Sequence, residues 1–464
     1  MYILNLDQVD RETPGVGLKA ANLGFLFKSG FSVPPGFVVT SEAFEKFLTD
    51  TGISMELPGI LGTVNPEDPQ TAFRACGWIK EMFAKVSGMD FLIRELRSAY
   101  NELSFGKDVS SAGGAALDIV RAGRSECFVS IRPSFSSGKE ACFSGHGKTS
   151  LNLISHRQVL SGIKDCWLSV FSPEALIYRK LQGVEGFSLG VIVQKMADSE
   201  LSGTLFTSEP ISGDRGKALV EGFWGLGETL SSGNVCPDQF LIDKETGVTE
   251  KKISRKLFLR RRGPLSGVTI QEKVPLSRVS AETLNERDFP KFSLIAKKAE
   301  ELLEGPQEIE WGVDRGKIVL LQARPLVFSK AQGFSNAQAT EQSDSLKEAT
   351  PPSFQGLGVS AGTAKGKALA VPDFSALQKP ETPAILLAKN LGMEILPYLK
   401  WFSGIISEQG GLGSCLASIA RESGIPIVTG IENATIILNG KEIALDGMAG
   451  SVHDIPHNQK TYQA

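Results

Sequence analysis

Four side chains able to bind a metal ion or a phosphate group fall within one short stretch of the chain. Residues 308–322 form two β-type runs around an Asp-Arg-Gly turn, which predicts a hairpin with a three-residue loop. That loop would pair Glu310 with Leu320, and it would place Glu308 opposite Gln322 on the same face. A carboxylate and a carboxamide oxygen one diagonal apart can share a hard cation such as Mg²⁺, which also binds phosphates. We therefore predict Glu310 and Gln322 as metal ligands.

The same residues also fit a solvated strand face, and their spacing by itself favours that alternative. The residues that follow favour the metal site instead, because Arg324 comes two positions after Gln322. The planar guanidinium of arginine suits phosphate oxygens. The cluster therefore indicates a site for a cation together with phosphate.

Cys415 is a second candidate for chemistry. It lies in a glycine-rich segment, 410–415 (GGLGSC), which opens a predicted helix that runs to Arg421. At a helix N-terminus the dipole and the unbonded N–H groups lower the pKa of a thiol and attract anions, so a thiolate there could attack a phosphoryl group. A reduced cysteine is also commonly just a small buried apolar side chain. None of the four histidines, at 146, 156, 453 and 457, lies in this segment.

Three shorter motifs have familiar spellings but the wrong context. Residues 147–149 end like a P-loop, yet Cys142 stands where that motif needs glycine. Residues 358–362 are spelled like a nucleophile elbow and 356–361 like a dinucleotide-binding turn, but no apolar strand precedes them. We interpret all three as turns.

Composition limits the classes of protein to consider. The chain has 464 residues, 49 Lys+Arg against 52 Asp+Glu, a net charge of −3 and 41% hydrophobic residues, which is typical of about three globular units. The near-neutral charge gives no case for a nucleic-acid or membrane partner, and we expect neither a membrane span nor a leader. The six cysteines have no CxxC spacing, which favours reduced thiols in the cytoplasm.

The region 1–328 has helix and strand patterns interleaved, which predicts an α/β or α+β fold. Helices are expected over 17–28 and from the Thr40-Ser41 cap to Leu48. Besides the hairpin, apolar runs predict strands at 128–132, 189–196, 203–207, 218–223 and 239–242.

Residues 329–353 are rich in Ser, Gln, Ala and Glu and predict a flexible linker, because they bury too little apolar surface to offset the entropy of ordering. The remaining unit, 354–464, has a normal domain size. It predicts a compact α/β layer with a helix opening at 410–411 and strands at 384–387, 404–406, 427–428 and 434–438.

Together these segments resemble the dikinases typified by phosphoenolpyruvate synthase and pyruvate phosphate dikinase, to which rifamycin phosphotransferase is related. The resemblance covers most of the chain. It rests on segments 17–40, 130–134, 143–153, 193–228, 232–243, 309–325, 356–368 and 404–435.

The resemblance implies an ATP-grasp nucleotide-binding region followed by a small swivelling domain, which in the family carries a phosphorylated histidine between active sites. Phosphoryl transfer needs mainly positioning and charge neutralisation from the protein. The implied roles are phosphate contacts for Lys19, Arg132 and Arg324, a glycine-rich loop with Gly145 and Thr149, an adenine-binding segment of Gln194, Lys195 and Met196, and Mg²⁺ ligation by Glu310 and Gln322.

The chain departs from the family pattern in three places. Where the family has Thr-Ser-His after two glycines, Gly413 replaces the threonine and Cys415 replaces the phosphoryl-accepting histidine. Pro133 follows Arg132 where the family has serine, and the loop after it is shorter. The pyruvate-binding barrel of the family, and the antibiotic-binding insert of the rifamycin enzyme, are not found in these 464 residues.

We therefore predict a cytoplasmic phosphotransferase component that uses ATP and Mg²⁺, with its oligomeric state left open. Its acceptor would be a pyruvate-like small molecule or a domain on another polypeptide. Cys415 would carry the phosphoryl group as phosphocysteine, belong to an inactive swivelling domain, be a small buried side chain, or be a substitution introduced to trap one state. The competing class is a non-catalytic ATP-binding regulatory module.

Overall fold

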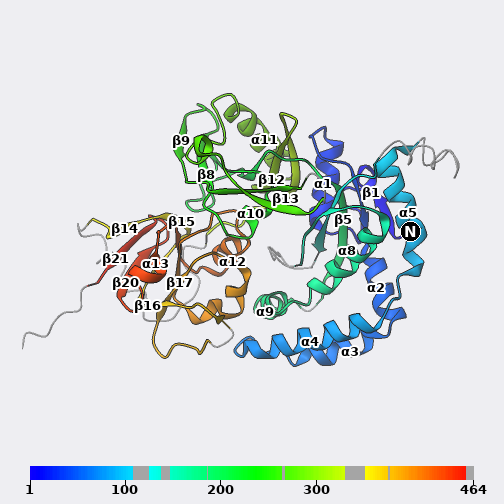
Figure 1. The fold of residues 1–464 in the computed structure, drawn as a ribbon, viewed down its shortest axis with the longest axis horizontal. Coiled ribbons are helices and arrows are strands. Elements are labelled where there is room, and N and C mark those ends of the chain that lie inside the picture. The colour runs from blue at the N-terminus through cyan, green and yellow to red at the C-terminus, as the bar shows by residue number, and fades with distance from the viewer. Residues whose placement is uncertain are drawn as a thin grey trace, which may run out of the picture.

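The computed structural model describes residues 1–107, 125–136, 147–184, 186–263, 267–329, 351–374 and 377–455. In this part of the chain the strands form three large sheets and one two-stranded sheet. Figure 1 shows the five-stranded sheet at the N-terminal end of the molecule, the six-stranded sheet in the middle and the eight-stranded sheet at the far end.

The first sheet is antiparallel throughout and is covered by helices. Its strands, in spatial order, are β1 (Ile3–Asn5), β2 (Gly36–Val39), β5 (Ser188–Lys195), β3 (Val129–Ser136) and β4 (Ser150–Leu153). The helices of this part are α1 (Leu18–Lys28), α2 (Ser41–Asp50), α3 (Ile53–Gly62), α4 (Pro69–Lys85), α5 (Asp90–Phe105), α8 (His156–Ser169) and α9 (Pro173–Gln182). The helices expected at 17–28 and 41–48 and the strands at 128–132 and 189–196 are therefore confirmed to within a few residues.

The second sheet is also antiparallel and is built around the predicted hairpin. Its spatial order is β13 (Lys317–Pro325), β12 (Gln307–Asp314), β6 (Leu201–Phe206), β7 (Lys217–Trp224), β8 (Asp238–Asp243) and β9 (Thr249–Lys252). One face of the sheet packs on α11 (Phe289–Leu302) in an apolar core, and α1 packs against β13. Smaller elements nearby are η1 (Leu6–Gln8), α10 (Glu228–Ser231), η2 (Leu276–Arg278) and the β10–β11 hairpin (Phe258–Arg262, Thr269–Lys273).

The register of the predicted hairpin differs from the one expected. Asp314 pairs with Lys317, so the loop has only two residues, Arg315 and Gly316, with φ of 49° and 75°. Two consecutive positive φ values are typical of a type I′ turn, which suits the twist of a hairpin. A bulge between Glu310 and Trp311 then adds one residue to β13. Glu310 consequently pairs with Gln322 rather than with Leu320.

The third sheet belongs to the C-terminal unit and has a parallel centre, from β16 to β19. Its spatial order is β14 (Phe354–Gln355), β21 (Ser451–Asp454), β20 (Glu442–Asp446), β16 (Thr363–Ala370), β17 (Ala384–Ala388), β18 (Gly404–Ser407), β19 (Ile427–Thr429) and β15 (Leu357–Ser360). The helices are η5 (Met393–Trp401), α12 (Cys415–Ser423) and α13 (Ala434–Ile437).

Two expectations for the C-terminal unit are wrong in detail. The strand expected at 434–438 is instead α13 (Ala434–Ile437), followed by Leu438 as its C-cap. Ala434 and Leu438, four residues apart, are buried while Ile436 is 75% exposed, which is helical periodicity. The helix expected to open at 410–411 begins instead at Cys415, after an N-cap at Ser414. Most of the predicted linker, residues 330–350, lies outside the described residues, so the domain boundaries stay a prediction.

Candidate functional site

A row of polar side chains crosses one face of the six-stranded sheet. The register pairs neighbours in the order Gln322, Glu310, Thr204, Glu221 and Gln239, one from each of β13, β12, β6, β7 and β8. Residues directly opposite each other project to the same side of a sheet. Their sequence neighbours point to the other side, into the core beneath α11. We call these five residues the polar row.

Glu310 and Gln322, at one end of the polar row, meet the requirement for a shared cation. Side chains that lie directly opposite have Cβ atoms about 4.5–5.5 Å apart. Gln322 is 7% exposed and Glu310 is half-buried. In the described part of the chain no three His, Cys, Asp or Glu side chains gather as a metal site. One carboxylate and one amide therefore fit Mg²⁺, which takes its remaining ligands from phosphate and water.

Arg324 lies two pairs further along the hairpin, opposite Glu308. Its guanidinium is hydrogen-bonded to the Glu308 carboxylate and donates to Ser418 Oγ at 3.1 Å. Arg421 Nη2 lies 3.7 Å from the same carboxylate. Since Ser418 and Arg421 belong to α12, this buried network joins the hairpin to the C-terminal unit.

Lys19, on α1, lies among the other charged candidates. Burial lowers the pKa of Lys19, and the positive charges of Arg324 and Arg132 lower it further, whereas Glu310 and Cys415 raise it. The helix that carries Lys19, α1, packs against β13 and β3, which carry Arg324 and Arg132. Cations held together in this way are stabilised by a bound anion, and a triphosphate would supply that charge.

Arg132 connects the first sheet to the second. Its Nη1 donates a 2.6 Å hydrogen bond to the carbonyl of Leu321, which is the extra residue of the bulge in β13. The bulge thus pairs Glu310 with Gln322 and also provides the carbonyl that holds Arg132 beside the hairpin. Arg132 is half-buried.

The segment predicted to contact adenine is the end of β5. Gln194 is 1% exposed, and its amide donates to the Pro34 carbonyl at 3.1 Å. Lys195 is exposed and Met196 half-buried. Gln194 is thus engaged with the loop before β2, and the adenine contact of these residues stays a prediction.

The predicted phosphate loop is described only in part. Thr149 is exposed and comes directly before β4. Gly145 lies outside the described residues. Their role over the phosphates stays a prediction.

Cys415 is the first residue of α12 and is half-buried. The N-cap Ser414 accepts a hydrogen bond from the Ala417 N–H at 3.3 Å. Just ahead of it, the N–H groups of Leu412 and Gly413 each donate to the Glu221 carboxylate at 2.8 Å. The glycine-rich segment of the C-terminal unit therefore contacts the polar row at Glu221.

Sequence reasoning missed three residues that shape this site: Glu221, Ser418 and Arg421. Two of them could have been noticed as charged residues in apolar surroundings. Glu221 is a lone carboxylate inside the apolar run of β7, and Arg421 lies among buried residues of α12. A charge in such a place needs a partner, because burying it unpaired is costly. Which partner it has could not be read from spacing.

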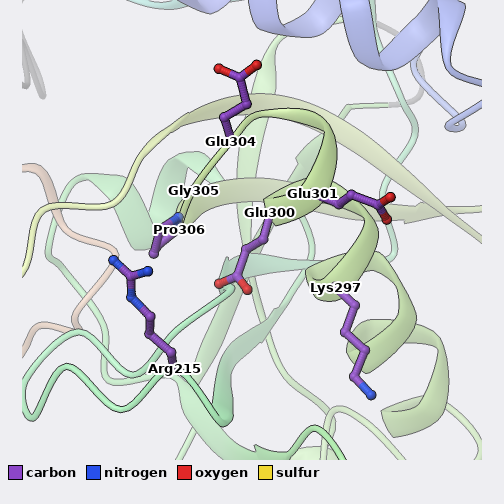
Figure 2. Close-up of a pocket in the computed structure, with 7 residues that line it drawn as sticks. All are labelled: Arg215, Lys297, Glu300, Glu301, Glu304, Gly305 and Pro306. Carbon is purple, nitrogen blue, oxygen red and sulfur yellow. The ribbon is translucent and has the colours of Figure 1, made fainter.

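The described part of the chain also has a surface hollow of about 440 Å³, lined by the end of α11, the turn after it and Arg215. Figure 2 shows Arg215, Lys297 and three glutamates around it. None of the predicted site residues lines this hollow. It is separate from the site on the hairpin.

Comparison with known proteins assigns the class. The model of the family "Pyruvate phosphate dikinase, AMP/ATP-binding domain" matches residues 13–345, and "PEP-utilising enzyme, mobile domain" matches residues 380–450. The chain therefore belongs to the pyruvate phosphate dikinase family of ATP-binding domains and carries a mobile domain after it.

Full-length relatives carry a more specific name. A probable phosphoenolpyruvate synthase of Archaeoglobus fulgidus is 31% identical over 98% of this chain, one of Methanothermobacter thermautotrophicus is 30% identical over 98%, and a phosphoenolpyruvate synthase of Aeropyrum pernix is 33% identical over 97%. The chain spans 58%, 63% and 58% of the lengths of these relatives.

Two further comparisons add little. An NMR solution structure of Enzyme I matches 17% of this chain and 33% of its own with 27% identity, and its TM-score of 0.16 carries no information on the fold. Among the described residues, no helix combines the length and the apolar character needed to cross a membrane.

Proposed function

We propose that this chain is the nucleotide-binding and phosphoryl-carrying part of a dikinase-type phosphotransferase. The observation that carries the proposal is the place of Cys415, which heads α12 two residues after Gly413. The Gly413 N–H donates to Glu221, which lies on the same polar row as Glu310 and Gln322. Membership of an ATP-binding family supports ATP as the nucleotide. Cys415 would then face the phosphates from the C-terminal unit.

Each residue has a role suited to its chemistry. Glu310 and Gln322 would hold Mg²⁺, which neutralises phosphate oxygens when bound. Lys19 and Arg132 would add positive charge where negative charge accumulates during transfer. Arg324 would exchange part of its contact with Glu308 for a phosphate oxygen.

The proposed reaction starts with the thiolate of Cys415. It attacks the β-phosphorus of ATP; an S–P bond forms, the bond from that phosphorus to the oxygen bridging to the α-phosphate breaks, and AMP leaves with the electron pair. Water then attacks the terminal phosphorus, inorganic phosphate leaves with the proton released to solvent, and phosphocysteine remains. The acceptor would be a pyruvate-like small molecule or a domain on another chain, in keeping with the names of the relatives.

A second candidate is a non-catalytic ATP-binding module. It is favoured by the cysteine at the position of the family's histidine, and by the contact of Glu221 with the N–H groups of Leu412 and Gly413. A carboxylate already occupies these donors, which an incoming phosphoryl group would otherwise meet. In this case ATP would bind without transfer.

Isotope labelling separates the two candidates. The protein is incubated with Mg²⁺ and ATP labelled at the β or the γ phosphate, and peptides are mapped by mass spectrometry under conditions that preserve thiophosphate. Transfer predicts β-label on Cys415 in the native chain and none in Cys415→Ala. Tight ATP binding without label or AMP release would overturn the transfer. Label in Cys415→His alone would show that the remaining site is competent and that cysteine blocks it.

We also infer a cytoplasmic location. The location follows from the cysteine spacing and the use of ATP.

A further inference from the structure

One contact between the C-terminal unit and the six-stranded sheet stands out by its chemistry. We call residues 410–414 the swivel loop. Both oxygens of Glu221 are used there: Oε1 accepts from the N–H of Leu412 and Oε2 from the N–H of Gly413, each at 2.8 Å. Gln239 Nε2 donates to Oε1 at 2.9 Å from the neighbouring strand. A buried carboxyl group thus accepts hydrogen bonds from two backbone donors of a separate unit. Burial raises the pKa of Glu221, and the hydrogen bonds from Gln239 and these two N–H groups oppose that rise because they favour the charged form.

The glycines of the swivel loop are necessary for this approach. A Cβ atom on Gly413 would lie 2.5 Å from Thr204 Oγ1 and 3.0 Å from Glu221 Oε2. A Cβ atom on Gly411 would lie 2.9 Å from Glu221 Oε1 and 2.8 Å from the Pro237 ring. Real Cβ atoms essentially never come within 3.0 Å of another heavy atom, so a side chain at 413 would force either the Thr204 and Glu221 side chains or the loop itself to shift.

The contact lies on the same row as the predicted metal ligands. Glu221 pairs with Thr204, and Thr204 pairs with Glu310. Two residues after Gly413 comes Cys415, the first residue of α12. The distance between the nucleotide site and Cys415 therefore depends on how the swivel loop is seated on the polar row.

We propose that Glu221 is the positioning residue that seats the swivel loop on the nucleotide-binding sheet and thereby holds Cys415 at the nucleotide site. This inference rests on the proposed function for its purpose, but the contact itself requires no transfer. Glu221 acts through the loop, to which both of its carboxyl oxygens are hydrogen-bonded. Loss of its carboxylate releases the loop, and Cys415 with it, into solvent.

Alkylation of Cys415 tests the proposal without ATP. The full-length protein is treated with iodoacetamide, and each cysteine is followed by peptide mass mapping. Two variants should each raise the rate of alkylation of Cys415 by about tenfold or more: Glu221→Gln, which removes the carboxylate, and Gly413→Ala, which adds the excluded Cβ on the loop. A tenfold change is equivalent to about 1.4 kcal/mol of lost contact between the loop and the sheet. Thr204→Ala combined with Gly413→Ala should recover part of the protection, because it removes the nearer oxygen.

A matched control removes a hydrogen bond between the two units elsewhere. Tyr178 donates to Glu422 Oε2 at 2.8 Å, further along α12. Tyr178→Phe should leave the rate at Cys415 within about twofold of the native rate, since it does not touch the swivel loop. Equal acceleration in Tyr178→Phe and Glu221→Gln would overturn the proposal, because the effect would then be general loosening.

Two further outcomes keep this proposal separate from the proposed function. An unchanged rate in both Glu221→Gln and Gly413→Ala would overturn the role of Glu221 even if Cys415 becomes labelled by ATP. Faster alkylation in both would support it even if no label is found. Circular dichroism of Gly413→Ala checks that the fold is retained, and this variant leaves the sheet residues unaltered.

Discussion

At the scale of single residues, the site brings together three cationic side chains. They repel one another unless a bound anion neutralises part of their charge. Lys19, Arg132 and Arg324 are all cationic, and Glu310 is the carboxylate that acts on Lys19. Their spacing in the sequence is large, yet the fold gathers them. Two predictions depend on these residues alone.

The first concerns the pH dependence of ATP binding. Burial and the charge of Arg324 lower the pKa of Lys19 from its ordinary value of 10.5. The ammonium form attracts phosphate, so affinity for Mg·ATP should fall as the pH rises through this lowered pKa, below the pH at which an ordinary lysine titrates. Isothermal titration calorimetry between pH 7 and 10.5 measures the decline.

Lys19→Arg is the control for this pH dependence, because a guanidinium keeps its charge throughout. This variant should bind ATP with no decline over the same range. A native affinity that stays constant up to pH 10.5 would contradict the placement of Lys19 at the phosphates.

The second concerns the metal. Glu310→Ala removes the carboxylate of the predicted Mg²⁺ pair and should weaken Mg·ATP binding by about tenfold or more, equivalent to about 1.4 kcal/mol. Without Mg²⁺, in EDTA, the variant and the native protein should bind ATP with similar affinity. Glu304→Ala, at an exposed residue near the hollow of Figure 2, serves as the matched control. Equal binding by Glu310→Ala and native protein in Mg²⁺ would refute the assignment.

At the scale of elements, α12 is the helix that links the two units. Arg421, fully buried, donates to the carbonyls of Leu412, Val359 and Val327 at 2.9, 3.3 and 3.1 Å and lies near Glu308. It therefore connects the swivel loop, β15 and the chain just after β13.

Arg421→Met tests how much the contacts of α12 contribute to the free energy of unfolding. The change leaves three carbonyls without their donor and a buried carboxylate with one cation fewer, and it should lower the free energy of unfolding by about 3 kcal/mol. Thermal and urea unfolding measure the change. Arg315→Ala, in the exposed hairpin loop, should alter stability by less than about 0.5 kcal/mol. Comparable losses in both variants would contradict the role of Arg421.

At the scale of the whole molecule, the interface between the two units contains buried hydrogen bonds and ion pairs. The Glu221, Glu308 and Arg421 contacts all cross between them. The mobile-domain family to which residues 380–450 belong is compatible with a contact that forms and breaks. The structure describes the state in which it is formed.

Cleavage in the predicted linker tests the strength of this association. A protease site inserted within 329–353 should allow the chain to be cut while the two pieces stay together, because the contacts between them remain. Size-exclusion chromatography at micromolar concentration should give a single peak. Glu221→Gln should shift the cut protein toward separate pieces, and complete separation of the native pieces would contradict the interface.

Much of the fold could be predicted from local pattern. The helix at 17–28 and the strands at 189–196, 203–207 and 218–223 were found because apolar periodicity is a property of neighbouring residues. The error at 434–438 arose where the run is apolar but only one helical side is buried. The error in the hairpin register arose because a bulge leaves no trace in the spacing of Glu310 and Gln322.

The sequence by itself determined the family, the types of charged residue at the site and the cysteine at the head of α12. Only the tertiary structure decided that Glu310 faces Gln322 directly, that Arg324 is held by Glu308 and Ser418, and that Glu221 carries the swivel loop. The reason is that residue type and local periodicity are encoded over a few positions. Contacts between residues some 190 positions apart, such as Glu221 and Leu412, depend on how packed sheets and helices meet.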